Sequence, residues 1–328
     1  MKNSFIFVGL LLLLVPLVTA QLRFGFYNST CPRAEQIVRK VIQQRFKNDP
    51  TITAAFLRMH FHDCFVRGCD GSVLIDPTST TPSEKDAVPN QTVRGFNIVD
   101  EIKKKLETAC PGIVSCADIV TLATRDSVAL ARGPVYAVPT GRLDGLISDP
   151  NLVDVPGPTF SVSEALQSFT EKGLTLMDMV ILLGAHTVGH AHCDFFRDRL
   201  SNFQGTGQPD PTMDPALVKT LFKVCGTQSL PFKKDPTAFL DQTTPFIVDN
   251  QYYNDIRSGK GIMQIDQELA LDPSSESFVS GFANDTLGFQ RSFADAMVKM
   301  GSIQVLTGND PAGQIRKNCR VFNPPTQR

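Results

Sequence analysis

The residues of this chain best suited to chemistry are its five histidines, which fall in two short stretches. His60 and His62 lie in the first stretch, and His186, His190 and His192 lie in the second; both stretches run into a cysteine. Histidine is the commonest metal ligand and the only side chain that titrates near neutrality without a perturbing environment. We therefore expect the two clusters to form one site between two helices, with a metal or cofactor held there.

The first cluster predicts a catalytic pair, Arg58 and His62. Residues four apart on a helix share a face, so these two side chains point the same way, Phe61 lies beside them and His60 turns largely elsewhere. A guanidinium beside a histidine lowers the pKa of the histidine and keeps it a neutral base. The pair could then take a proton from a substrate and stabilise developing negative charge. An ion-pairing arginine beside a structural histidine explains the two residues equally well.

A loop rich in oxygen ligands follows the first cluster directly. Asp63, Asp70 and Ser72 lie among glycines, and Cys64 and Cys69 could clip the loop shut. Such a tight, oxygen-rich loop suits a hard cation such as calcium, although its spacing differs from that of an EF-hand. A solvated acidic turn is the alternative, and the segment alone favours neither.

The second cluster is compatible with two metal sites of different chemistry. His186 and His190 have the spacing of a zinc-binding helix, but Thr187 stands where a metalloprotease has its catalytic glutamate. Oxidised cysteines would also be unable to supply thiolate ligands. The alternative is that His186 is the sole protein ligand of a haem iron, with His190 and His192 as helix-end histidines.

The elements that must carry these clusters are mainly helical. Apolar residues recur at helical spacing, and capping patterns mark several helix starts. The sequence predicts one all-α unit with long loops, arranged as one or two lobes. The predicted helices are Arg33–Phe46, Thr51–Phe65, Ser115–Gly133, Ser161–Gly173, a segment from Thr175 through the second histidine cluster, Pro215–Val224, Asp249–Arg257 and Ser275–Met300, with Val135–Val138 as a short strand candidate.

The first 20 residues are expected to be a signal peptide and not part of the fold. Lys2 precedes an apolar run too short to span a bilayer comfortably, and small residues up to Ala20 suit cleavage before Gln21. Cleavage would remove only Lys2 from the 32 basic residues, leaving 31 against 33 acidic residues. This balance gives no reason to expect a nucleic acid or an anionic membrane as partner, and no second apolar stretch predicts a membrane anchor.

The cysteines and the glycosylation sequons agree with an exported chain. All eight cysteines follow the signal segment. An even number in a secreted protein implies paired disulfides, although eight cysteines allow 105 pairings. The sequons at Asn28 and Asn284 predict N-linked glycans, and a third sequon begins at Asn90.

Four segments of the sequence together resemble the secreted plant peroxidases, class III. These segments are RMHFHDCFVRGCDGS at 58–72, SCADI at 115–119, GAHTVGHAHC at 184–193 and VDNQYY at 248–253, and all eight cysteines fall at that family's spacing. The resemblance implies a haem-peroxidase fold over residues 21–328, with minimal β-strand. Haem would lie between a distal lobe carrying Arg58 and His62 and a proximal lobe carrying His186.

The resemblance also implies a role for each distal residue. His62 corresponds to the proton acceptor, Arg58 to the group that stabilises the transition state, and Phe61 to the aromatic residue that shields the distal side of the haem. Asn90 corresponds to the asparagine that accepts the other ring proton of His62. A buried amide in such a hydrogen bond cannot carry a glycan, so we expect the Asn90 sequon to stay unmodified.

On the proximal side the resemblance implies one haem b whose iron is bound by His186, with Asp266 accepting the other ring proton of that histidine. Pro156 would belong to the substrate entrance. The first of two calcium sites would use Asp63, Val66, Gly68, Asp70, Ser72 and Glu84, and the second would use Thr187, Asp241, Thr244, Ile247 and Asp249. The implied disulfides are Cys31–Cys110, Cys64–Cys69, Cys116–Cys319 and Cys193–Cys225.

The implied function is that of a monomeric peroxidase of the extracellular space or cell wall. It would reduce hydrogen peroxide, with His62 moving the proton and Arg58 stabilising the departing hydroxide, and it would oxidise phenolic donors in one-electron steps. Two rival classes are a zinc hydrolase built on the second histidine cluster and a calcium-dependent binding protein without catalysis. Neither class explains Asn90 and Asp266 together with the distal pair.

Overall fold

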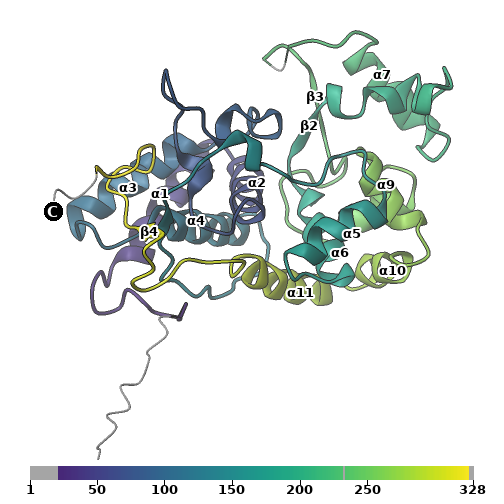
Figure 1. Cartoon of the computed structure of the whole chain (residues 1–328). Coiled ribbons are helices and arrows are strands. Elements are labelled where there is room, and N and C mark those ends of the chain that lie inside the picture. The colour runs from purple at the N-terminus through teal and green to yellow at the C-terminus, as the bar shows by residue number, and fades with distance from the viewer. Residues whose placement is uncertain (1–20, 232, 325–328) are drawn as a thin grey trace, which may run out of the picture.

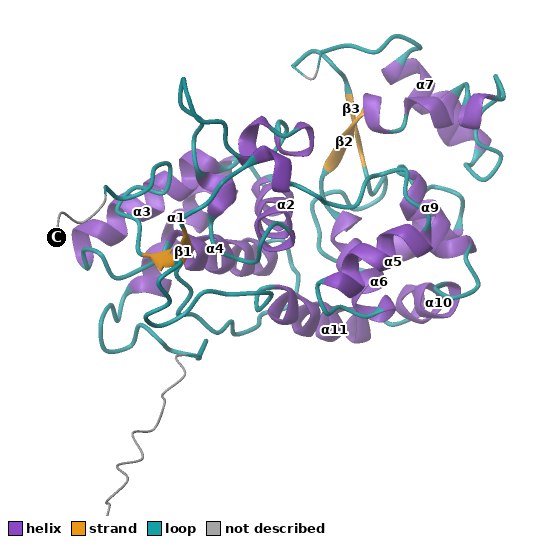
Figure 2. Ribbon diagram, in the orientation of Figure 1, coloured by secondary structure: helices purple, strands orange, loops and turns teal. Residues whose placement is uncertain are grey.

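The computed structural model describes residues 21–231 and 233–324, so the expected signal peptide, residues 1–20, lies outside the described residues. The described chain is mainly helical with short strands, which confirms the all-α prediction (Figure 2). Its helices are α1 (Ala34–Asn48), α2 (Ile52–Phe65), α3 (Phe96–Ala109), α4 (Cys116–Leu130), α5 (Val162–Glu171), α6 (Leu176–Leu183), α7 (Pro215–Cys225), α8 (Gln251–Arg257), α9 (Gln264–Leu271), α10 (Glu276–Asn284) and α11 (Thr286–Met300). Two antiparallel ribbons pair β1 (Asp144–Gly145) with β4 (Gly313–Gln314) and β2 (His190–His192) with β3 (Thr237–Phe239).

The first lobe consists of α1 to α4 around one apolar core (Figure 1). Val38 and Ile42 of α1 and Ile119 and Val120 of α4 are fully buried in it. Helical spacing gathers the apolar side chains of α1 on one face, whereas α4 is buried on nearly all sides and forms the centre of the lobe. Both α1 and α3 pack against α4.

The second lobe consists of α5, α6 and α8 to α11 around a second core. A row of aromatic rings lies in this core: Tyr253, Phe289 and Phe293 are fully buried, and Phe289 contacts Tyr253 edge-on and Phe293 at a tilt. α2 lies between the lobes, because it contributes Phe56 to the first core and Phe65 to the second. Figure 1 shows the two lobes side by side.

A smaller apolar cluster lies beside the second lobe, where the β2–β3 ribbon packs with α7 (upper right in Figure 1). His190 lies opposite Phe239 in the register of this ribbon. The Cys193–Cys225 disulfide joins the end of β2 to the last residue of α7. The ribbon therefore follows directly on the segment that carries His186.

Several helix starts follow the predicted capping pattern. Complete capping boxes open α5 at Ser161 and α6 at Thr175. Ser115 caps α4 by accepting a hydrogen bond from the backbone N–H of Asp118. The carboxylate of Asp118 does not return this bond, because it is bound to buried groups elsewhere.

Two secondary-structure predictions, the strand Val135–Val138 and the single helix Ser275–Met300, are wrong. Residues Val135–Val138 form no strand, since no other segment within the described chain pairs with them. The predicted helix Ser275–Met300 is divided into α10 and α11 at Asp285. The φ of −135° and ψ of 86° at Asp285 leave the helical region, and its side chain accepts a hydrogen bond from the backbone of α11.

The prediction that one helix carries the second histidine cluster is also wrong. His186 lies in a short 3-10 turn, Gly184–Thr187, that follows α6, whereas His190 and His192 lie in β2 and are not helix-end residues. Gly189 between them has a φ of +103°, a conformation that interrupts a helix and that glycine adopts readily. Of the two helices predicted to carry the site, the first is α2, whereas the second histidine cluster begins in a 3-10 turn.

Two helices, α3 and α9, are absent from the sequence-based assignment. The buried residues of α3 include Ile98, Ile102 and Leu106, whose spacing carries the helical signal. α3 begins after Gly95 and α9 after Met263, and neither residue has a side-chain oxygen that could cap the helix. In α3, the helical spacing of apolar residues therefore predicts the helix, and a capping motif does not.

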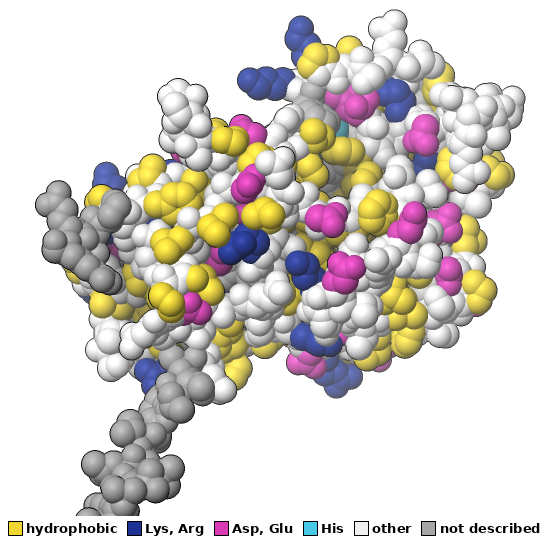
Figure 3. Space-filling view, in the orientation of Figure 1, with side chains coloured by type: hydrophobic (Ala, Val, Ile, Leu, Met, Phe, Trp, Pro, Cys, Tyr) yellow, Lys and Arg dark blue, Asp and Glu magenta, His cyan; other side chains and the backbone are white. Residues whose placement is uncertain are grey.

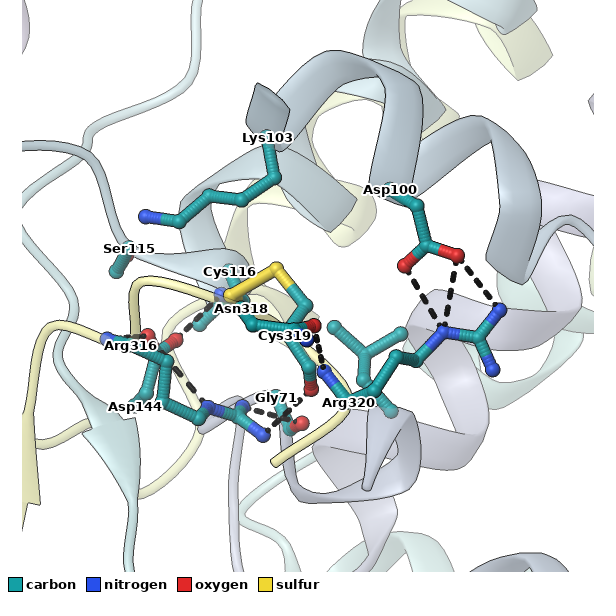
Figure 4. Close-up of a disulfide and its surroundings, with 12 residues drawn as sticks. Gly71, Asp100, Lys103, Ser115, Cys116, Asp144, Arg316, Asn318, Cys319 and Arg320 are labelled. Carbon is teal, nitrogen blue, oxygen red and sulfur yellow. Dashed lines mark hydrogen bonds and ion pairs between the residues drawn. A yellow bond between two sulfur atoms is a disulfide. The ribbon is translucent and has the colours of Figure 1, made fainter. Parts of the chain in front are cut away.

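Four disulfides cross-link the described chain, in the same pairs that the resemblance implies. The Cys116–Cys319 bridge ties the C-terminal segment to the first residue of α4 (Figure 4). Beside it, Arg320 donates hydrogen bonds of 2.8–3.1 Å from Nε and Nη2 to the carboxylate of Asp100 on α3. The end of the described chain is therefore fixed against the first lobe.

The surface carries charges of both signs. On the face drawn in Figure 3, acidic and basic side chains are interspersed and neither sign covers a large area. This distribution agrees with the nearly balanced composition of 32 basic and 33 acidic residues. Among the described helices, none is both long and apolar enough to cross a membrane.

A buried ion pair joins α4 to the end of α11. Asp118 and Arg142 are essentially inaccessible to solvent, and Arg142 Nη1 donates to Asp118 Oδ1 at 2.7 Å. The Tyr27 hydroxyl donates to the other carboxylate oxygen at 2.6 Å. Arg142 Nε donates to the carbonyl of Gly301, the residue after α11, at 2.9 Å. The ion pair between Asp118 and Arg142 thus connects the core of the first lobe to α11, the last helix of the second lobe.

We predict that Asp118→Asn lowers the free energy of unfolding by about 3–5 kcal/mol, because it leaves the Arg142 charge buried without its partner. The matched control is Glu101→Gln, which breaks the exposed pair with Arg45 and should cost about 1 kcal/mol or less. Denaturant titration of both variants measures the difference. Equal losses for the two substitutions would contradict this assignment of the buried pair.

Candidate functional site

α2 carries three predicted site residues on its side toward the second lobe. Arg58 and Phe61 are half-buried and His62 is 5% exposed. Phe61 packs toward Phe169 of α5, with ring centroids 6.3 Å apart. His60 turns away and is buried against α4. The helical period therefore separates the two histidines of the first cluster as the sequence predicts.

The hydrogen bonds of Asn90 define the proton position on His62. Asn90 Nδ2 donates to the backbone carbonyl of Glu84 at 2.7 Å, so its Oδ1 is the atom that faces His62. This Oδ1 lies 2.6 Å from His62 Nδ1. An amide oxygen only accepts, so Nδ1 carries the ring proton and Nε2 keeps its lone pair. His62 can therefore accept a proton at Nε2 without changing its contact to Asn90.

Electrostatics keep His62 neutral over a wide range of pH. Burial, reinforced by the positive charge of Arg58, lowers the pKa of His62 to about 3, although the hydrogen bond that His62 donates to Asn90 acts in the opposite direction. Burial also lowers the pKa of Arg58, to about 10, which leaves its guanidinium charged at neutral pH. The site thus holds a neutral base beside a permanent cation.

Arg58 is anchored by neutral oxygens only. Its Nη1 donates to Thr92 Oγ1 and its Nη2 donates to the carbonyl of Pro89, both at 2.7 Å. It forms no ion pair with any residue of the described chain. Its charge is therefore not cancelled by a carboxylate, and it can act on an anion that develops beside His62.

His186 has a different partner. Its Nδ1 donates to Asp266 Oδ1 on α9 at 2.7 Å, and Asp266 is 1% exposed. Burial alone would lower the pKa of His186, but the Asp266 carboxylate outweighs burial and raises it. Within the described chain Nε2 of His186 has no hydrogen-bond partner, so this nitrogen is available to a metal.

The two histidine-bearing segments face each other across the interface of the lobes. The turn that carries His186 packs against α2. A Cβ atom placed on Gly189 would lie only 2.9 Å from Cβ of Ala54, so backbone and helix approach closely there. The charge of Arg58 slightly opposes the rise in the pKa of His186 that Asp266 causes, so the two groups act on each other electrostatically.

These donors fit a haem iron and do not fit zinc. A single neutral imidazole nitrogen backed by a carboxylate is a haem-ligand arrangement. A zinc site would need His186, His190 and His192 to converge. Across the described residues, the only three His, Cys, Asp or Glu side chains whose ligand atoms lie within 4.8 Å of one another are His60, Cys64 and Cys69, and the two cysteines are joined in a disulfide.

The loop after α2 forms a cluster of buried oxygens. Asp63, Ser72 and Glu84 are fully buried, and Asp63 Oδ1, Ser72 Oγ and both carboxylate oxygens of Glu84 have no hydrogen-bond partner in the described chain. Burial, together with the neighbouring carboxylates of Asp63 and Asp70, raises the pKa of Glu84 to about 9. Orphaned buried oxygens that repel one another fit a hard cation.

Two other predicted ligands, Val66 and Gly68, lie in the same loop. Val66, directly after α2, is 1% exposed. Gly68 has a φ of +102° and passes so close to the chain at Gln304 that a Cβ atom would lie 2.5 Å from its carbonyl oxygen. A residue with a side chain would not fit there, so the glycine is required by the shape of the loop.

A second cluster of oxygens surrounds Thr187. Its Oγ1 lies 3.2 Å from Asp241 Oδ2, from the carbonyl of Ile247 and from Asp249 Oδ1. Thr244 Oγ1 lies 3.2 Å and 3.1 Å from the same two carboxylate oxygens. Two hydroxyl protons cannot satisfy so many acceptors, and burial raises the pKa of both aspartates. All five predicted ligands converge here, and the set fits calcium.

The last predicted site residue, Pro156, lies in the loop before α5. It is half-buried. Two residues later, the carbonyl of Pro158 accepts a hydrogen bond of 3.1 Å from the backbone N–H of Ile265. Because Ile265 precedes Asp266, this loop lies against the helix that supports His186.

The chain is similar in sequence to known proteins of one family. A model of the peroxidase family matches residues 38–285. Two proteins of Arabidopsis thaliana are similar over most of the chain: Peroxidase 57 is 55% identical over 313 residues (95% of this chain, 96% of that protein), and Peroxidase 44 is 56% identical over 311 residues (94% and 96%). Peroxidase 28 of the same plant is 53% identical over 319 residues (96% and 97%).

The chain therefore belongs to the peroxidase family. It is an enzyme that reduces hydrogen peroxide, membership of the family implies a haem cofactor, and phenolic donors fit this class. Sequence reasoning missed Thr92 and Tyr252 among the contacts of the site. Thr92 was visible only as the third residue of the Asn90 sequon, and Tyr252, which donates to Asp266, only as part of the motif at 248–253.

Proposed function

We propose that His62 accepts a proton from hydrogen peroxide and that Arg58 stabilises the hydroxide that leaves. The hydrogen bond between His62 Nδ1 and Asn90 Oδ1, at 2.6 Å, carries this proposal. It leaves the Nε2 lone pair free to take a proton from one peroxide oxygen and to return it to the other. The low pKa of His62 keeps this nitrogen unprotonated between turnovers.

Arg58 acts on the oxygen that leaves. Its guanidinium is oriented by Thr92 and Pro89 and keeps its full charge, since both partners are neutral oxygens. A preoriented cation stabilises a departing hydroxide without having to reorganise during the reaction. His62 and Arg58 therefore divide the work between moving a proton and stabilising an anion.

His186 would hold the iron of one haem b through Nε2, and Asp266 would orient it through Nδ1. When bound, the haem takes up the oxidising equivalents of peroxide and passes them to donors one electron at a time. Phe61 shields the space beside His62 from solvent. Pro156 lies in a loop packed on α9 and would line the entrance for a phenolic donor.

We also propose a calcium ion in each oxygen cluster. The first ion would bind Asp63, Val66, Gly68, Asp70, Ser72 and Glu84, and the second would bind Thr187, Asp241, Thr244, Ile247 and Asp249. The carbonyl of Glu84 orients Asn90, and Thr187 is adjacent to His186. Each cation would therefore fix the backbone beside one of the two histidines.

The mature enzyme in this proposal is residues 21–328, a secreted monomer of the extracellular space or cell wall, released from the signal peptide 1–20. Asn28 and Asn284 are exposed and suit N-linked glycans. Asn90 is 2% exposed and uses both amide atoms in hydrogen bonds, so it would remain unmodified.

His62→Leu should lower the second-order rate constant for peroxide by about 10²–10⁴-fold, the range of general acid–base catalysis. His190→Leu is the control, since His190 is an exposed residue of β2 and should react at the normal rate. Stopped-flow mixing of haem-loaded protein with peroxide measures both. A normal rate in the His62 variant would contradict its role as proton acceptor.

Metal analysis should find two calcium ions for each chain. Asp70→Asn and Asp241→Asn should each remove one ion, because each replaces a buried carboxylate of a different cluster by a neutral amide. Asp198→Asn is the control at an exposed carboxylate and should keep both ions. Full occupancy in either buried variant would contradict the corresponding site.

A further inference from the structure

Asp266 receives two hydrogen bonds on a single oxygen. His186 Nδ1 donates to Oδ1 at 2.7 Å, and the Tyr252 hydroxyl donates to the same atom at 2.9 Å. The other oxygen, Oδ2, accepts only a longer bond of 3.3 Å from the backbone N–H of Met263. Tyr252 and His186 therefore share the lone pairs of one carboxylate oxygen.

Two of the three side chains are away from solvent, and the third, His186, is half-buried. Tyr252 and Asp266 are each 1% exposed. The Tyr252 ring meets the His186 ring nearly edge-on, with centroids 6.1 Å apart and planes at 83°. In the described chain His186 is the only ion-pair partner of Asp266. The two hydrogen bonds that Oδ1 accepts are thus the main contacts that stabilise the negative charge of Asp266.

We propose that Tyr252 is a positioning residue that limits how much negative charge Asp266 confers on His186, and that it thereby raises the reduction potential of the bound haem. The inference rests on the proposed role of His186 as iron ligand. A hydroxyl donor withdraws charge from the shared oxygen and makes it a weaker acceptor for the His186 proton. That proton then stays closer to Nδ1, the imidazole donates less charge to iron, and the ferric state is stabilised less.

The adjacent residue supplies a matched control. Tyr253 is as fully buried as Tyr252, and its hydroxyl also makes one hydrogen bond, to the carbonyl of Val180 at 3.1 Å. This bond does not involve Asp266 or His186. Tyr252→Phe and Tyr253→Phe therefore remove the same atom from neighbouring buried rings, and only the first removal changes the carboxylate.

The test uses two properties of the haem-loaded protein that do not depend on turnover. Spectroelectrochemistry gives the ferric–ferrous midpoint potential, and resonance Raman spectroscopy of the ferrous protein gives the iron–histidine stretching frequency. Tyr252→Phe should lower the potential and raise the stretching frequency, whereas Tyr253→Phe should leave both at their wild-type values. Unchanged values in Tyr252→Phe, or equal shifts in both variants, would overturn the inference.

A second substitution guards against a folding defect. A fluorinated tyrosine at position 252 keeps the ring and the hydroxyl but donates a stronger hydrogen bond, so it should shift both properties in the opposite direction. A shift in the same direction as Tyr252→Phe would overturn the inference. Absence of an iron–histidine band in the wild-type protein would instead contradict His186 as ligand, so failure of the proposed function remains distinguishable.

Discussion

The site depends on one difference between two hydrogen bonds. His62 and His186 each use Nδ1 to donate a proton, but His62 donates to a neutral amide oxygen and His186 to a carboxylate. Burial and Arg58 then lower the pKa of His62, whereas Asp266 overcomes burial and raises that of His186. The same side chain thus becomes a neutral base on α2 and an imidazole polarised by a carboxylate in the turn after α6, which suits the proposed roles of proton acceptor and iron ligand. A metal shared by both histidine clusters is therefore not the arrangement that the structure favours.

The rest of the fold holds these two acceptors in place. Asn90 can present its oxygen to His62 only because its nitrogen is bound to the carbonyl of Glu84, a residue of the first oxygen cluster. His186 lies in a turn, without a long helix around it, and its neighbour Thr187 is surrounded by the second cluster. Each histidine is thus supported by a set of buried oxygens that a cation would stabilise. The lobes meet at α2, which carries Arg58 and His62, the proposed catalytic pair, together with residues of both cores.

The all-α class and most helices could be predicted from local patterns, and the residues proposed for the site, apart from Thr92 and Tyr252, from local patterns and the resemblance. Arg58 and His62 follow from helical spacing, which α2 obeys throughout. The second cluster could not be assigned in the same way, because the positive φ of Gly189 converts an apparent helix into a turn and a strand. Neither the anchors of Arg58 nor the contact of Tyr252 with Asp266 has a sequence signature, since each depends on segments brought together by tertiary packing.

Exchanging the acceptor of His62 tests most directly whether the charge of the acceptor sets the role of each histidine. Asn90→Asp replaces the neutral amide oxygen by a carboxylate and should raise the pKa of His62, as Asp266 does for His186. The rate constant for peroxide, measured after rapid pH jumps, should fall in acid with an apparent pKa of about 3 in the wild-type enzyme. In Asn90→Asp the same fall should begin at clearly higher pH. Identical acid limbs in the two proteins would contradict the claim that the charge of the acceptor sets the role of each histidine.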